Sequence, residues 1–161
     1  MANDFKLLLN ALVKQPAFMV LHFTNSNNLI EQIKQFCKDE CSEYKIFYLD
    51  KSKKELEKFK DDITTIQYLN LDRKQYTMQG KFYDYLFIDA LPQDRVSFFK
   101  KIYKSLKNAA PIFIFLPNSS KELSYKIEAE LIECNYVASS KMQIDNYLVV
   151  SAKKMHGWSG S

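Results

Sequence analysis

The chain has 161 residues and a formal net charge of +4, and 47% of its residues are hydrophobic. This length suits one domain with a sizeable core. The small charge disfavours a nucleic-acid-binding protein, and no apolar run approaches the roughly 20 residues that cross a bilayer. Asp4 and Lys6 interrupt the N-terminus, where a signal peptide would be apolar. We therefore expect a cytoplasmic protein whose Cys37, Cys41 and Cys134 are core or surface thiols, because their spacing fits neither disulfides nor a closed metal site.

The first half of the chain alternates helical and extended patterns. Apolar periodicity predicts helices over residues 4–14, 29–41 and 52–63, and strands over residues 17–23, 44–49 and 65–69. Pro16 ends the first helix, and Ser52 with Glu55 forms a capping box for the third. Such alternation is typical of a sheet covered by helices on both faces.

The stretch from Tyr83 to Asn118 organises the second half. It contains an apolar run over 83–90, a helical pattern over 96–106 and a second apolar run over 111–116. This pattern predicts one βαβ unit with parallel strands that are buried on both faces. A helix over 119–134 follows, and two closing strands over 135–140 and 146–152 predict an antiparallel hairpin.

These elements predict an α/β fold with one doubly wound, mainly parallel seven-stranded sheet that ends in the antiparallel hairpin. We expect a single domain over residues 1–153 and a flexible tail over 154–161. Ligands of doubly wound sheets bind beyond the carboxyl ends of the strands. The residues that this rule places along one edge are 24–28, Asp50, 70–72 and 89–94.

Several of these positions resemble motifs of the class I S-adenosylmethionine-dependent methyltransferases, which share this Rossmann-like fold. Tyr48-Leu49-Asp50 is similar to the family's second strand, and Asn70-Leu71-Asp72 falls where a polar residue follows the third. Tyr83–Asp89 is similar to the fourth-strand motif, and the terminal hairpin matches the family's closing pair. The resemblance implies that S-adenosylmethionine is the cofactor, that Asp50 binds its ribose, that Asp72 lies near its adenine, and that Asp89 is a catalytic residue that orients the methyl acceptor.

Phe87-Ile88-Asp89-Ala90 is similar, more narrowly, to the cation-dependent O-methyltransferases of the caffeoyl-CoA type. In that group the fourth-strand Asp is a metal ligand, and an Asp-Asn pair after the fifth strand supplies two more. The corresponding pair here is Pro117-Asn118, and proline offers no side-chain oxygen. We therefore expect no metal.

The turn over residues 24–28 departs from the family, which has a glycine-rich turn there. Glycine allows positive φ and lets the cofactor lie against bare backbone. Asparagine tolerates the left-handed region better than most residues, so the turn can still form. Thr24 and Asn25 would then line the cofactor site, and with Ser26 they would occupy part of the room that the methionine moiety needs.

Two interpretations of function remain open. One is a methyltransferase of unknown substrate, and the other is a non-catalytic scaffold that binds a protein or another ligand. The chain is too short for a large substrate lid, so a partner protein or a second copy would complete an acceptor site. Asp50, Asp72 and Asp89 have a structural alternative as rim or helix-capping carboxylates. His22 lies within an apolar strand, which favours a hydrogen-bonded core histidine over a catalytic base.

Overall fold

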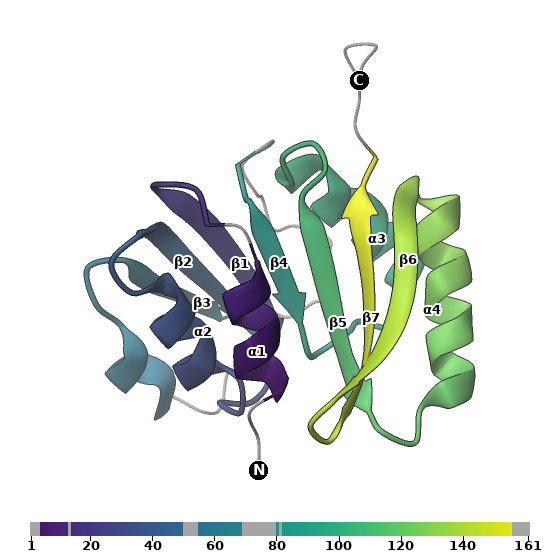
Figure 1. The fold of residues 1–161 in the computed structure, drawn as a ribbon, viewed down its shortest axis with the longest axis horizontal. Helices are drawn as coiled ribbons and strands as arrows, with labels where there is room; N and C mark the ends of the chain where they lie inside the picture. The colour runs from purple at the N-terminus through teal and green to yellow at the C-terminus, as the bar shows by residue number, and fades with distance from the viewer. Residues whose placement is uncertain (1–3, 13, 50–54, 69–79, 81, 156–161) are drawn as a thin grey trace.

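The structure, a computed structural model, describes residues 4–12, 14–49, 55–68, 80 and 82–155. They form a seven-stranded sheet in the order β3-β2-β1-β4-β5-β7-β6 (Figure 1). The strands are β1 (Phe18–Thr24), β2 (Cys41–Tyr48), β3 (Thr64–Tyr68), β4 (Tyr85–Ile88), β5 (Pro111–Pro117), β6 (Tyr136–Ile144) and β7 (Tyr147–Lys154). Strands β1 to β5 are parallel, and β7 is antiparallel to β5 and β6. The predicted mainly parallel sheet with a closing antiparallel hairpin is confirmed.

Helices cover both faces of this sheet. The helices are α1 (Asp4–Ala11), α2 (Ile30–Cys37), the 3-10 helix η1 (Glu55–Phe59), α3 (Arg95–Ser105) and α4 (Lys121–Glu133). Side chains of α1 and α2 join one buried cluster, and those of α3 and α4 join the other. Figure 1 shows α1 and α2 in front of the sheet and α3 behind it. The sheet is therefore the middle of three layers.

The position of α1 is fixed by aromatic packing and by the hairpin. The Phe5 ring meets Phe87 of β4 and Phe115 of β5 edge to face, with centroid separations of 6.0 and 5.1 Å. The Asp145 carboxylate, in the turn between β6 and β7, accepts hydrogen bonds from the backbone N–H groups of Asp4 and Phe5 at 3.2 and 3.4 Å. A distant turn thus satisfies donors that a helix start leaves without partners.

Several predicted boundaries are wrong. The helix expected over residues 29–41 ends at Cys37, because Asp39 adopts a φ of 75° and turns the chain so that Cys41 begins β2. The helix expected over residues 4–14 ends at Ala11. The predicted tail begins within β7, which reaches Lys154, and residues 156–161 lie outside the described part of the chain. The three cysteines are buried thiols, as expected.

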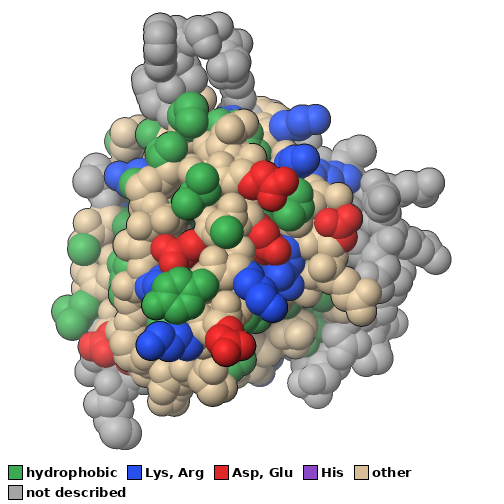
Figure 2. Space-filling model, turned by 90° about the vertical axis from the view of Figure 1, so that its right-hand side faces the viewer, with side chains coloured by type: hydrophobic (Ala, Val, Ile, Leu, Met, Phe, Trp, Pro, Cys, Tyr) green, Lys and Arg blue, Asp and Glu red, His purple; other side chains and the backbone are tan. Residues whose placement is uncertain are grey.

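The surface that carries α4 and β6 has mixed charges. Acidic and basic side chains are interspersed with hydrophobic ones on this face (Figure 2). Lys141 pairs with Glu128 at 3.3 Å, and Arg95 pairs with Glu130 at 2.8 Å, which ties α3 to α4. Surfaces that bind nucleic acid usually carry charges of a single, positive sign, and this face does not. Within the described residues, no helix has the length and apolar character needed to span a membrane.

Candidate functional site at the carboxyl edge of the sheet

The turn over residues 24–28, which follows β1 and is called the β1 turn, meets Asp89 at one edge of the sheet. It does so because β1 and β4 are parallel neighbours. Phe23 is paired with Ile88, so Thr24 and Asp89 stand side by side at the carboxyl ends of the two strands. The backbone N–H of Asp89 donates to the carbonyl oxygen of Phe23 at 3.0 Å. The predicted edge therefore brings together Thr24, Asn25 and Asp89.

Asp50 and Asp72, the residues predicted to hold the ribose and adenine, lie outside the described residues. The nearest described position is Leu49, directly before Asp50. Its backbone N–H donates to the carbonyl oxygen of Thr24 at 2.9 Å. The end of β2 therefore lies against the end of β1, as a ribose-binding acid after β2 would require. The roles of Asp50 and Asp72 stay predictions.

The β1 turn is closed by a side chain instead of by glycine. The buried Thr24 hydroxyl donates to the carbonyl oxygen of Ser26 at 2.9 Å, and Thr24 Oγ1 accepts from the Ser26 backbone N–H at 3.1 Å. The Tyr48 hydroxyl donates to the carbonyl oxygen of Asn25 at 3.1 Å. No residue from 24 to 28 has a positive φ. The expectation that asparagine would supply left-handed geometry is wrong, because a threonine-centred turn needs none.

His22 connects Asp89 to the core. The imidazole is completely buried, with Nδ1 2.8 Å from the Tyr44 hydroxyl and Nε2 3.0 Å from Asp89 Oδ1. Burial holds the pKa of Tyr44 well above its usual value, so this hydroxyl keeps its proton. An ionised carboxylate only accepts hydrogen bonds. Nε2–H therefore donates to Asp89, and Nδ1 is hydrogen-bonded to the Tyr44 hydroxyl. The predicted core histidine is confirmed.

Ser26 reaches across from the β1 turn to the same carboxylate. Its hydroxyl donates to Asp89 Oδ2 at 3.5 Å, a long hydrogen bond that bridges the two strand ends. The Asp89 side chain is only 4% exposed. Both carboxylate oxygens have partners, yet two oxygens offer about four acceptor positions in all. The carboxylate therefore keeps acceptor positions that these two hydrogen bonds do not use.

Sequence reasoning named Asp89 but missed Tyr44 and Ser26 as parts of its surroundings. Tyr44 and Tyr48 stand on the same face of β2, and the alternation of that strand was a readable signal. Ser26 gave no such signal, because its contact depends on how the turn folds. Among the described residues, no group of three or more His, Cys, Asp or Glu side chains is placed to hold a metal ion.

No family model matches this sequence, and no curated protein is significantly similar to it. Solved structures do match. A complex of the Trm112 methyltransferase activator with a methyltransferase from Haloferax volcanii matches with a TM-score of 0.75 and 9% identity, covering 96% of this chain and 90% of that chain. An S-adenosylmethionine-dependent methyltransferase from Listeria monocytogenes matches with a TM-score of 0.74 and 9% identity. That match covers 96% of this chain and 98% of that chain.

The tRNA methyltransferase TrmI from Aquifex aeolicus has the highest identity of these three, at 17%. Its TM-score is 0.66, and the match covers 97% of this chain and 68% of that one. At such identities the likeness establishes architecture and leaves the reaction open. Together with the strand order and the terminal hairpin, it shows that this chain has the class I methyltransferase-type fold.

Proposed function

We propose that this chain is an S-adenosylmethionine-dependent methyltransferase-like protein that acts on a substrate not yet identified. One observation carries the proposal: Asp89 lies beside the β1 turn at the carboxyl edge of a sheet with the methyltransferase strand order. In this proposal Asp50 binds the ribose hydroxyls and Asp72 lies near the adenine. Thr24 and Asn25 line the path of the cofactor.

Asp89 would then act on the methyl acceptor by positioning. Methyl transfer needs the acceptor atom in line with the sulfonium methyl, and fixed geometry supplies much of the rate. Asp89 is suited to this because His22 fixes one carboxylate oxygen at 3.0 Å. An N–H or O–H of the acceptor can donate to the remaining acceptor positions of that carboxylate. No metal is part of this proposal.

A second function has its own supporting observation. Ser26 bridges to Asp89 across the space where the methionine moiety would enter. A bridge of this kind favours a non-catalytic scaffold that keeps the fold and binds a protein or another ligand. The neighbour from Haloferax volcanii was solved with a methyltransferase activator. By analogy, the present chain would work with a partner protein or a second copy, which would also complete an acceptor site.

Calorimetric titration with S-adenosylhomocysteine separates the two functions. Binding should be saturable, and Asp50→Ala should weaken it at least tenfold, because the ribose loses a charge-assisted hydrogen bond. Asp62→Ala removes another exposed carboxylate and should leave the affinity unchanged. An absence of heat at millimolar ligand would reject the cofactor proposal and leave the scaffold.

A further inference from the structure

A cavity of about 560 Å³ lies at the opposite edge of the sheet, where the parallel strands begin. Phe18, Tyr85 and Pro111, the first residues of β1, β4 and β5, line it, as does Lys153 near the end of the antiparallel β7. Asp89 follows the other end of β4, four residues and roughly 13 Å from Tyr85. The volume is in the range of small-molecule sites, about 300–1,000 Å³. This cavity is therefore separate from the carboxyl-edge site.

The apolar wall of the cavity includes aromatic rings that are almost completely buried. Phe18, Tyr85 and Phe113 are 1%, 6% and 4% exposed. The Phe18 and Tyr85 rings meet edge to face at 5.6 Å, and both pack on Phe36 of α2, at 5.0 and 5.4 Å. These contacts hold the rings in place whether or not the cavity is filled. The wall is thus rigid and apolar, and only a small part of each ring is exposed to the cavity.

The cavity stays open because α1 stops short and small side chains surround it. The last residue of α1, Ala11, lies at the cavity, so the helix covers none of the sheet beyond it. Ala109 and Ala138 also line the space, with φ angles of 64° and 56°. Residues other than glycine seldom adopt this left-handed conformation. The small alanine side chains fill little of the cavity. The backbone on two sides thus turns without closing the cavity.

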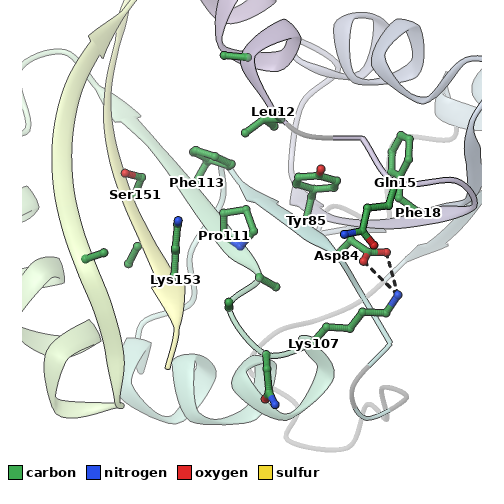
Figure 3. Close-up of a pocket in the computed structure, with 16 residues that line it drawn as sticks. Leu12, Gln15, Phe18, Asp84, Tyr85, Lys107, Pro111, Phe113, Ser151 and Lys153 are labelled. Carbon is green, nitrogen blue, oxygen red and sulfur yellow. Dashed lines mark hydrogen bonds and ion pairs between the residues drawn. The ribbon is translucent and has the colours of Figure 1, made fainter. Parts of the chain in front are cut away.

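Charge on the lining is unevenly distributed. Lys107 Nζ contacts both carboxylate oxygens of Asp84 at 3.1 Å, and Asp84 Oδ2 also accepts from the Met19 backbone N–H at 2.8 Å. Figure 3 shows this pair on one side of the cavity and Lys153 on the other, extending from β7 alongside Pro111. Lys153 forms no ion pair within the described part of the chain. The lining therefore holds two lysines against one aspartate, an excess of one positive charge.

We propose that this cavity binds a small planar aromatic molecule that carries one anionic group, such as an aryl carboxylate or sulfonate. Its ring packs on Pro111 and on the exposed parts of Tyr85 and Phe113. Its anion meets Lys153. The carboxylate of Asp84 is already engaged by Lys107, so it does not repel the anion strongly. A cationic ligand finds no available carboxylate among the lining residues, which gives the site its selectivity. This proposal is independent of the proposed methyl transfer, because the two sites lie at opposite edges of the sheet.

Two fluorescent probes test the proposal: anilinonaphthalene sulfonate and the same ring system without the sulfonate, N-phenylnaphthylamine. The sulfonated probe should bind once per chain. Lys153→Gln should weaken the sulfonated probe about tenfold through loss of a charge-assisted contact. It should leave the neutral probe unchanged. Ala11→Trp, which places an indole at the mouth, should weaken both probes at least tenfold.

Matched variants keep the result specific. Lys126→Gln removes an exposed lysine of α4, and Leu7→Trp adds an indole to an exposed position of α1, so neither should change binding. Thermal unfolding verifies that each variant is folded. Equal effects of Lys153→Gln on both probes would overturn the proposal, as would retained binding in Ala11→Trp. Displacement of the probe by S-adenosylhomocysteine would place it at the carboxyl edge and also overturn the proposal. A protein that dimerises through this face would lose probe binding as its concentration rises, which would equally contradict it.

Discussion

His22 holds Asp89 from within the core: Nε2 of the completely buried ring lies 3.0 Å from Asp89 Oδ1. The carboxylate at the end of β4 therefore cannot turn freely, and its orientation depends on the packing between β1 and β2. A group fixed in this way is suited to positioning a ligand, because no rotamer entropy is lost on binding. Because of this contact, the geometry of the carboxyl edge around Asp89 depends on one core residue, His22.

Replacement of His22 should therefore destabilise the protein strongly. His22→Phe leaves the Asp89 carboxylate and the Tyr44 hydroxyl buried without their shared partner. We expect the free energy of unfolding in urea to fall by about 2–4 kcal/mol. Tyr44→Phe leaves only His22 Nδ1 without its partner and should cost about 1 kcal/mol. Equal effects of the two variants would contradict a stabilising role of the His22–Asp89 contact.

The Ser26 bridge should control access to the cofactor site. Ser26→Gly removes the hydroxyl that contacts Asp89 Oδ2, and it clears side-chain volume from the β1 turn. If the chain binds S-adenosylhomocysteine, we expect this variant to bind it about tenfold more tightly in calorimetry. Ser42→Gly, at an exposed position of β2, serves as the control. Weaker binding by Ser26→Gly would show that the serine contacts the ligand instead of obstructing it.

The Arg95–Glu130 pair should contribute measurably to stability. Two parallel hydrogen bonds of 2.8 and 2.9 Å join the side chains, which are 24% and 21% exposed. A double-mutant cycle with Arg95→Ala and Glu130→Ala should give a coupling energy of about 1 kcal/mol. The same cycle on Lys60 and Glu57, an exposed pair, should give a value near zero. A smaller coupling for Arg95–Glu130 than for Lys60–Glu57 would refute this ranking.

Asp61 should make stability depend on acid pH. Burial raises its pKa, but Lys34 Nζ at 2.9 Å and the backbone N–H groups of Thr64 and Ile63 outweigh burial and lower the pKa to about 2. A lowered pKa in the folded state contributes stability above the unfolded value, about 3.9, and loses it as pH falls through 2.

We therefore expect Asp61→Asn to cost about 1 kcal/mol at pH 7, a figure kept small because the side chain is 43% exposed. The difference from the unmodified protein should vanish near pH 2. Urea unfolding at several pH values measures it, with Asp62→Asn as the control. A difference that is constant with pH would exclude ionisation of Asp61 as its cause.

Replacement of Ala17 by glycine should stabilise the protein, whereas the same replacement of a helical alanine should destabilise it. Its φ of 60° is costly for a residue with a Cβ, so Ala17→Gly should stabilise the protein by about 0.5–1 kcal/mol. Ala129 is exposed within α4, and Ala129→Gly should destabilise by about 1 kcal/mol. Thermal and urea unfolding of the two variants should thus differ in sign, and a shared sign would contradict strain at Ala17.

Local pattern was sufficient for the architecture. The apolar runs at β4 and β5, with an amphipathic helix between them, predicted the central βαβ unit, and the closing strands predicted the hairpin. The end of α2 was not predictable in this way. Asp39 adopts positive φ within a segment whose composition still favours a helix. Polar residues at turns offer several backbone conformations, and only the packing of the neighbouring strands selects one.

The sequence by itself determined which residues face the core and at which edge the polar strand ends gather, because side-chain periodicity is a local property of helices and strands. Only the tertiary structure decided what Asp89 touches. Its partners His22 and Ser26 are 67 and 63 residues away, and the pairing of Phe23 with Ile88 brings them together. The cavity at the opposite edge likewise depends on where α1 ends above the sheet. Contacts between distant segments follow from register and packing, which no local pattern encodes.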